Sequence, residues 1–256
     1  QQEEEPQEQQ QPAVQQQHEQ QQQDVPAESE VPFGFVADGD AGMQTGFQSM
    51  GHTIGWEVFD PSNALFVDVE ELARDAARQA LVKLNARPAP SGAMPVVIKN
   101  GSGGVLFHEA CGHGLEADLI AKGASVYAGK TGELVASPLV TLVDDGTMAG
   151  EWGTLAIDDE GHATQRNVLI ENGVLTDYMW DYLRSRNEGR APSGNGRRQG
   201  YMHLPMVRMT NTFVLDGTDE PDDIIAATEH GVYVAELGGG SVNTASGDFV
   251  FGMREA

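Results

Sequence analysis

The alternation of apolar and polar residues is most regular between Glu70 and Asn85, where it follows the period of an α-helix. Acidic residues at the start of this segment suit the positive end of the helix dipole. We therefore predict a helix over residues 70–85 that packs through one face and carries no catalytic group. Its apolar stripe comprises Leu72, Ala73, Ala76, Ala80, Leu81 and Leu84.

Shorter apolar segments are typical of β-strands. Between Phe33 and Asn63, glycines and aromatic residues alternate in short pieces, which predicts brief strands and turns. One helix is predicted near residues 176–186, with Tyr178, Tyr182 and Leu183 packing inward. Further strands are predicted at residues 95–99, 138–143, 167–171, 174–175, 206–215, 232–237 and 249–251, with Asn172-Gly173 as a hairpin turn.

These elements predict an α+β fold in three parts. Residues 1–32 are rich in Gln and Glu and cannot bury enough apolar surface to fold, so we predict a disordered tail. Residues 33–135 form a mixed α/β region with the packing helix, and this region ends with a distorted helix that carries a metal motif. Residues 136–256 form a mainly β region that is expected to be incomplete at its carboxy end.

The metal motif follows the apolar run Val105–Phe107, which leads into His108, Glu109 and His113. Neutral imidazole nitrogens suit a borderline-soft ion such as zinc. A Glu beside the first histidine can take a proton from water without binding the ion itself. The residue types therefore predict a metal site with two histidine ligands and one carboxylate base.

The spacing of the two histidines requires a distorted helix. A step of five residues on an ideal α-helix rotates the side chain by about 140°, which points the two rings apart. One extra residue absorbed in a π-bulge or kink would bring both rings to one face, and Gly112 makes that distortion inexpensive. Two partly buried, hydrogen-bonded histidines beside a glycine-rich turn remain the alternative.

Charge and composition exclude some functions. The formal net charge of −24 and only 15 Lys and Arg residues argue against nucleic-acid binding, because phosphates are neutralised by clustered cations. No apolar run approaches membrane-spanning length, and no signal peptide is recognisable. The single cysteine fits a reducing compartment.

Two acidic segments invite a calcium interpretation. Asp144-Asp145 and Asp158-Asp159-Glu160 lack the alternating ligands of a calcium loop. We therefore predict that both form solvated turns.

Several blocks of sequence resemble one family in the same order. His108-Glu109-Ala110-Cys111-Gly112-His113-Gly114-Leu115-Glu116-Ala117-Asp118 closely resembles the signature of the TldD/PmbA family of metallopeptidases, in its catalytic branch with the pattern His-Glu-x-x-x-His. The later blocks are Gly194–Arg198, Leu204–Thr212, Gly238–Gly240 and Ser246–Phe251. The resemblance runs from about Phe33 to Ala256.

The resemblance implies a cytoplasmic zinc peptidase that hydrolyses unfolded peptides and works with a related partner subunit or as a homo-oligomer. Glu109 would be the general base, and Arg197, Arg198 and Arg208 would hold carboxylate or carbonyl groups of the substrate. The strand around Gly238, Gly239 and Gly240 would present a sheet edge to which an extended peptide can add.

The third zinc ligand is missing from the motif. A catalytic zinc takes three protein ligands, and the resemblance implies a cysteine nearer the carboxy terminus, so we expect the third ligand beyond Ala256. Cys111 is interpreted as a small buried residue, and helix geometry makes Glu116 and Asp118 poor substitutes. A non-catalytic peptide-binding or scaffold subunit, or a structural zinc, remain the alternative interpretations.

Overall fold

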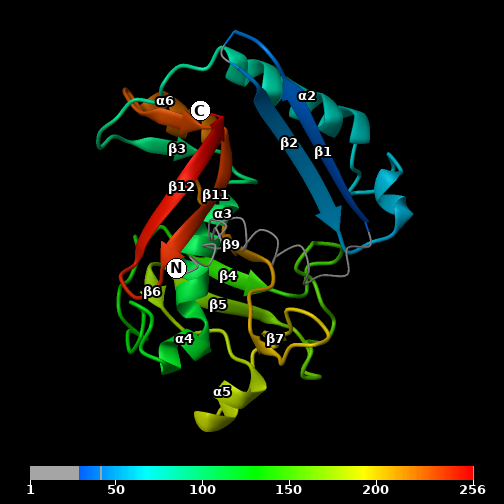
Figure 1. Ribbon diagram of the computed structural model, residues 1–256. Coiled ribbons are helices and arrows are strands. Elements are labelled where there is room, and N and C mark those ends of the chain that lie inside the picture. Colours follow the sequence, from blue (N-terminus) through cyan, green and yellow to red (C-terminus); the bar gives the residue numbers. More distant parts are fainter. Residues whose placement is uncertain (1–28, 41, 256) are drawn as a thin grey trace, which may run out of the picture.

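The computed structural model describes residues 29–40 and 42–255, and these residues form the predicted α+β fold (Figure 1). The helical elements are the 3-10 helices η1 (Trp56–Phe59) and η3 (His113–Leu115), the π-helix η2 (His108–Gly112), and the α-helices α2 (Val69–Leu84), α3 (Gly104–Phe107), α4 (Ala117–Ala121), α5 (Tyr182–Asn187) and α6 (Pro221–Ala227). The strands are β1 (Ser29–Ala37), β2 (Gln44–His52), β3 (Val96–Ile98), β4 (Leu142–Asp145), β5 (Arg166–Glu171), β6 (Val174–Leu175), β7 (Gly196–Arg197), β8 (Met206–Val207), β9 (Thr212–Val214), β10 (Val232–Val234), β11 (Glu236–Asn243) and β12 (Asp248–Glu255).

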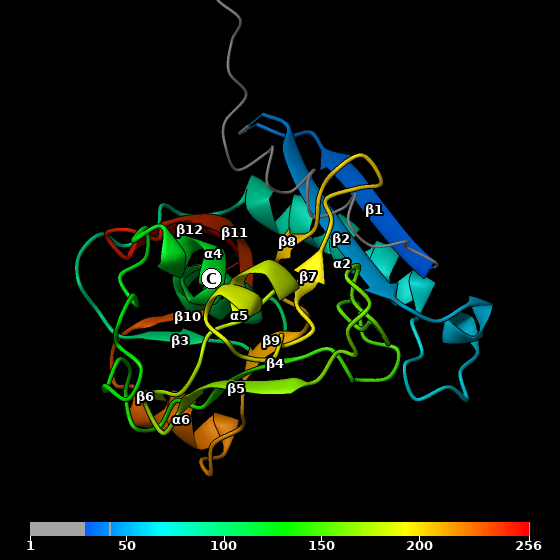
Figure 2. The same ribbon diagram turned by 90° about the horizontal axis from the view of Figure 1, so that it is seen from below.

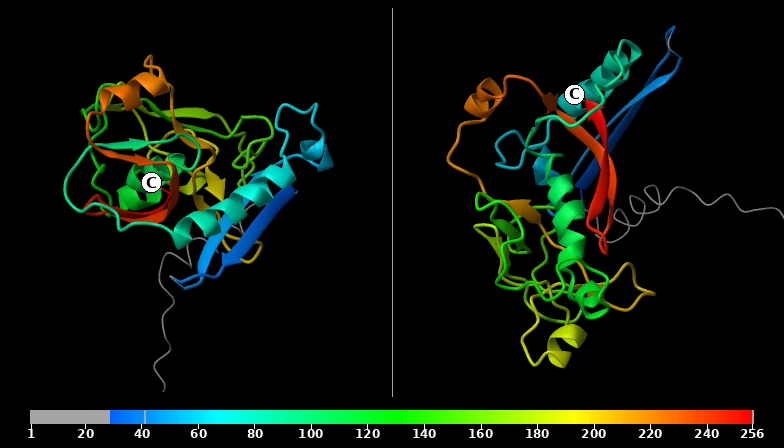
Figure 3. Two further views of the ribbon diagram at one scale, coloured as in Figure 1. Left: turned by 90° about the horizontal axis from the view of Figure 1, so that it is seen from above. Right: turned by 90° about the vertical axis from the view of Figure 1, so that its left-hand side faces the viewer.

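Helix α2 lies along the antiparallel hairpin of β1 and β2, as Figure 3 shows. It begins after Asp68, whose carboxylate accepts hydrogen bonds from the first backbone N–H groups of the helix. A Cβ atom on Gly46 of β2 would lie 1.9 Å from the carbonyl oxygen of Ala76, so glycine allows the close approach of strand and helix. The packing helix is confirmed, except that Leu81 of the predicted stripe is 58% exposed.

Strand β1 begins at Ser29, whereas the sequence placed the end of the unstructured tail at residue 32. The rest of that prediction, for residues 1–28, lies outside the described residues. Strands β1 and β2 each extend over 9 residues, longer than the brief strands expected between Phe33 and Asn63.

A four-stranded antiparallel sheet in the order β6-β5-β4-β9 forms the centre of the second half of the chain, and Figure 2 shows these strands side by side. Leu142, Leu169, Ile170, Leu175 and Val207 contribute to its hydrophobic core, which reaches the segment after the metal motif through Leu115 and Ala117. The sheet and the segment that follows the metal motif therefore share one hydrophobic core.

A parallel pair joins two distant segments, since Val96–Ile98 of β3 lies in register with Val232–Val234 of β10. The hairpin of β11 and β12 follows directly. Glu236 at the start of β11 accepts hydrogen bonds from Gln48 and Gln79 and pairs with Arg254. This carboxylate ties the hairpin to the layer of β1, β2 and α2.

The helix predicted at residues 176–186 begins only at Tyr182. Its first half is extended instead, because Met179 forms a parallel bridge with Glu116, and Asp181 caps the helix by accepting from the N–H of Arg184. Tyr178 is buried as predicted. Tyr182 and Leu183 are 45% and 55% exposed, so the prediction that they pack inward was wrong.

The prediction of solvated acidic turns was wrong for Asp144-Asp145, which lie in β4, whereas Asp159 and Glu160 do form a turn in which Asp159 is exposed. Asp144 lies in β4 with no exposed surface and accepts hydrogen bonds from Asn195 Nδ2 (2.7 Å), from the N–H and hydroxyl of Thr210 (both 2.8 Å) and from the hydroxyl of Thr212 (2.7 Å). We call these four residues the Asp144 cluster. Asp145 and Asp158 are buried as well and accept from backbone N–H groups.

Candidate metal centre

The metal motif is folded as three successive helical segments of different pitch. Helix α3 leads into the π-helix η2, which contains His108, and the 3-10 helix η3 begins at His113. The backbone N–H of His113 donates to the carbonyl of His108, five residues earlier, as in a π-helix. The predicted distortion is therefore confirmed. A Cβ atom on Gly112 would lie 2.2 Å from Met209 Sδ, which explains the glycine inside this turn.

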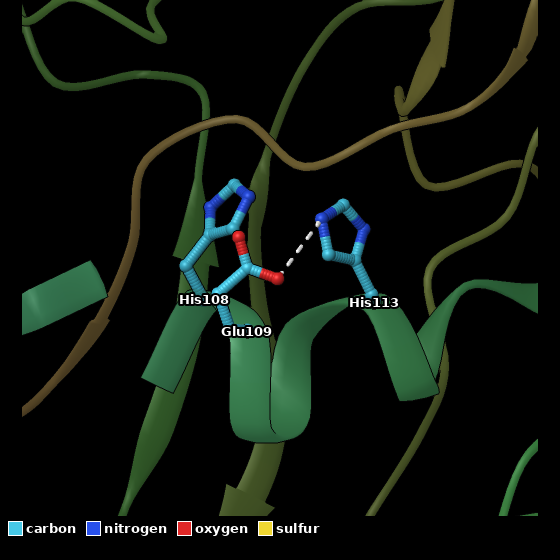
Figure 4. Close-up of side chains that lie close together, drawn as sticks. All are labelled: His108, Glu109 and His113. Carbon is cyan, nitrogen blue, oxygen red and sulfur yellow. Dashed lines mark ion pairs between the residues drawn. The ribbon is translucent and has the colours of Figure 1, made fainter. Parts of the chain in front are cut away.

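The π-helix places both imidazoles on one face. Their ring centroids lie 4.8 Å apart with an interplanar angle of 89°. Figure 4 shows His108 and His113 on the same side of the ribbon, with the Glu109 carboxylate between them. The possible ligand atoms of the three residues all lie within 4.8 Å of one another, and they form the one such group found among the described residues.

The electrostatic environment favours uncharged imidazole at His108. Burial, with smaller contributions from His113, Arg197 and Arg208, lowers the pKa of His108 to about 3. Burial also acts to lower the pKa of His113, but the hydrogen bond and charge of Glu116 and the charge of Glu109 raise it above its ordinary value. A neutral imidazole is the form that donates its lone pair to a metal ion.

Glu109 is 5% exposed, and its Oε2 has no hydrogen-bond partner among the described residues. Nε2 of His113 lies 3.9 Å from that oxygen. Burial raises the pKa of Glu109. A buried carboxylate oxygen without a donor, facing two imidazoles, fits a site for a cation such as zinc.

The predicted arginines differ in their positions. Arg208 Nη1 lies 3.4 Å from Glu116 Oε2, and its charge, like that of Arg197, is close enough to lower the pKa of His108. Arg198 is exposed, and its backbone N–H donates to Asp159. Two of the three arginines therefore lie near the imidazoles, and nothing places Arg198 there.

The predicted substrate strand lies beside the metal motif. Gly238, Gly239 and Gly240 belong to β11, which contacts α3 and η2 and pairs with β12. The register shifts near Leu237, and Gly239 has a φ of 110°, a conformation that favours glycine. This strand, which contacts the metal motif, is thus irregular at its glycines.

The residues weighed as substitutes for the third ligand lie outside the group. Glu116 contacts His113 from the Nδ1 edge of the ring, Asp118 pairs with Lys122, and the thiol of Cys111 accepts from the hydroxyl of Tyr127 at 3.6 Å. The contact of Glu116 with His113 was not predicted. The only sequence signal for it is the interval of three residues, which puts two helical side chains on one face.

The fold and the motif together define an α+β protein with a two-histidine, one-carboxylate metal motif on a π-helix. Comparison with known proteins agrees, because the sequence profile described as "PmbA/TldA metallopeptidase C-terminal domain" matches residues 91–256. This chain belongs to the PmbA/TldA metallopeptidase family.

This chain is similar to named relatives over only part of the length of each relative. A "Metalloprotease TldD homolog" of Haemophilus influenzae is 53% identical over 184 residues, which cover 72% of this chain and 38% of that protein. A "Metalloprotease" of Methanothermobacter thermautotrophicus is 39% identical over 221 residues, covering 86% of this chain and 47% of that protein. The chain thus spans less than half the length of these two relatives.

A solved structure supports the fold. The crystal structure of TldE from Thermococcus kodakarensis superposes with a TM-score of 0.67 at 25% identity, over 84% of this chain and 47% of that chain. No helix in the described part of the chain is both long and apolar enough to cross a membrane.

Proposed function

We propose that this chain carries the zinc site of a peptidase that hydrolyses unfolded or extended peptides. The observation that supports this most strongly is the π-helix, which gathers His108, Glu109 and His113 within 4.8 Å. The names of the metalloprotease relatives agree with it. The proposal includes one zinc ion per chain, held by both histidines and by a third protein ligand beyond Ala256.

The chemistry of the proposed reaction is divided between the ion and the chain. Zinc bound at such a site by His108 and His113 would polarise a carbonyl group and lower the pKa of its water to about 7. Glu109 accepts the proton of the attacking water and delivers it to the nitrogen of the departing amine. The raised pKa of Glu109 suits the first transfer, because it makes the carboxylate a stronger base toward the attacking water.

The proposed peptide site is the edge of β11. Among the described residues, β12 is the only strand paired with β11, so the other edge of the strand that contains Gly238–Gly240 has no strand partner there. An extended peptide bound as an added strand would be held mainly through its main chain, so weak side-chain selectivity follows. Arg197 is the arginine that we assign to a carbonyl or carboxylate group of this peptide.

The proposal also covers assembly and location. One protein of similar fold is titled TldE, which supports a related partner subunit, or a second copy of the chain, in the working assembly. The net charge of −24 makes nucleic acid an unsuitable partner. A cytoplasmic location agrees with the single cysteine.

The first test is Glu109→Gln. The amide cannot accept the proton, so peptide hydrolysis should fall by a factor of about 100 to 10,000. Zinc content and peptide binding should remain, because neither requires a base. Glu133→Gln, which changes an exposed carboxylate, is the matched control. Undiminished turnover in Glu109→Gln would show that another group is the base.

Elemental analysis separates the remaining possibilities. The chain, and any natural carboxy-terminal extension of it, should be compared with His108→Ala in each form. Zinc near one ion per chain that is lost in His108→Ala would support the site. Zinc without hydrolysis in every form would favour a structural ion or a scaffold subunit, and no zinc in any form would contradict the proposal.

A further inference from the structure

Glu116 is a polar residue beside the metal motif whose backbone neighbours are held by hydrogen bonds on both sides. It joins η3 to α4 in an extended conformation, with φ −75° and ψ 122°. The flanking backbone is held in a parallel bridge, because Met179 N–H donates to Leu115 (2.9 Å) and Ala117 N–H donates to Met179 (3.0 Å). These three neighbours belong to the hydrophobic core, so the Glu116 backbone cannot shift without disturbing it.

The Glu116 carboxylate faces one edge of His113. It is 2% exposed, and its Oε1 lies 3.2 Å from His113 Nδ1. A carboxylate only accepts hydrogen bonds, so this contact keeps the proton on Nδ1 of the neutral ring. The lone pair is then on Nε2, the nitrogen that lies 3.9 Å from Glu109 Oε2. Glu116 thus turns the binding nitrogen of His113 toward the group formed with His108.

The second oxygen of Glu116 is also engaged. Arg208 Nη1 lies 3.4 Å from Oε2. The backbone of Arg208 is fixed by Asn195, whose carbonyl accepts from the Arg208 N–H (2.8 Å) and whose Nδ2 donates to the Arg208 carbonyl (2.9 Å). Since Asn195 also donates to Asp144, the contacts run from His113 to the buried Asp144 cluster.

We infer that Glu116 is a positioning residue, which fixes the tautomer and orientation of His113 for metal binding, and that Arg208 keeps Glu116 aligned. The part that concerns the metal rests on the proposed function, whereas the tautomer of His113 does not. This role replaces the substrate contact predicted for Arg208. In this role Glu116 is not itself a metal ligand, because the Glu116 carboxylate contacts Nδ1 of His113 and not Nε2.

The test combines two measurements on Glu116→Gln, Glu116→Ala and Arg208→Gln. The ¹⁵N signals of the His113 ring, recorded without metal at a pH where the ring is neutral, report which nitrogen carries the proton. Competition with a chelator gives the affinity for zinc. Asp118→Asn is the matched control, since Asp118 is a buried carboxylate two positions away that pairs with Lys122.

The unaltered chain should carry the proton on Nδ1, and Glu116→Ala should lose this preference and bind zinc about 10- to 100-fold more weakly. Glu116→Gln keeps an oxygen that can accept from Nδ1, so it should recover part of both properties and serves if the alanine variant does not fold. Arg208→Gln should weaken zinc binding less, and Asp118→Asn should leave the His113 signals unchanged.

A proton on Nε2 in the unaltered chain would overturn the inference, as would Glu116→Ala with the tautomer and zinc affinity of the unaltered chain. Arg208→Gln with unchanged affinity and unchanged signals would overturn the role of Arg208. If no form of the protein binds zinc, the proposed function fails, while the ring signals still decide whether Glu116 sets the tautomer.

Discussion

Glu109 and Asp144 are both buried carboxylates, and they differ in what surrounds them. Asp144 has no exposed surface and accepts four hydrogen bonds, whereas Glu109 is 5% exposed and its Oε2 has no donor among the described residues. Burial raises the pKa of both. Four donors partly offset desolvation at Asp144, whereas at Glu109 it is the charge of His113 that opposes desolvation. The first carboxylate therefore holds strands together, and the second is available to a proton or a cation.

The largest effect that follows from this contrast is expected for Asp144→Ala. The substitution leaves donors of Asn195, Thr210 and Thr212 buried without an acceptor, so the free energy of unfolding should fall by about 3 to 5 kcal/mol. Urea denaturation measures this loss, with Asp219→Ala at an exposed position as the control. A loss below about 1 kcal/mol would mean that the cluster does not stabilise the fold.

A smaller effect is expected in the pH dependence of stability. Burial, opposed by hydrogen bonds from Thr212, Asn195 and Thr210, raises the pKa of Asp144 above 3.8. The folded state then keeps a proton that the unfolded chain has released, so the stability from this group is complete below about pH 3.8 and is lost as the pH rises through the raised pKa.

Asp144→Asn, which does not titrate, gives the reference for this effect. The free energy of unfolding of the unaltered chain, relative to Asp144→Asn, should decrease from about pH 4 upward. Urea denaturation of both proteins over a series of pH values measures the difference. A relative stability that increases with pH would show that the donors outweigh burial and that the pKa is lowered.

The smallest effect on stability is expected for Glu109→Gln. No donor loses its acceptor at Oε2, and the amide is cheaper to bury than a charged carboxylate. The free energy of unfolding should rise or stay within about 1 kcal/mol of the unaltered chain, as measured by urea denaturation. A decrease of about 2 kcal/mol or more would place Glu109 with Asp144 as a structural carboxylate.

The sequence predicted the part of the site that depends on local geometry. A step of five residues between His108 and His113, with Gly112 in between, requires a wider turn if both rings share a face, and the π-helix supplies it. Helix α2 could also be predicted from the sequence, because both its apolar period and its N-terminal cap at Asp68 lie within the segment itself.

The parts that depend on distant partners could not be predicted. Asp144 is followed by another aspartate, which is typical of a solvated turn, and its donors come 51 to 68 positions later in the chain. Glu116 and Arg208 are 92 positions apart. The helix expected from residue 176 was wrong for the same reason, since Met179 pairs with Glu116 across the fold.

The parallel pairing of β3 with β10 fixes both ends of one long segment. Val96–Ile98 and Val232–Val234 lie side by side, so the two ends of the segment between β3 and β10 are close together in space. That segment contains the π-helix, the central sheet and the Asp144 cluster. Closing a loop of this length costs conformational entropy that grows only slowly with the number of residues. The metal motif and its supports therefore form a nearly closed insertion, which can gain or lose residues in its surface turns without moving the strands that hold its ends.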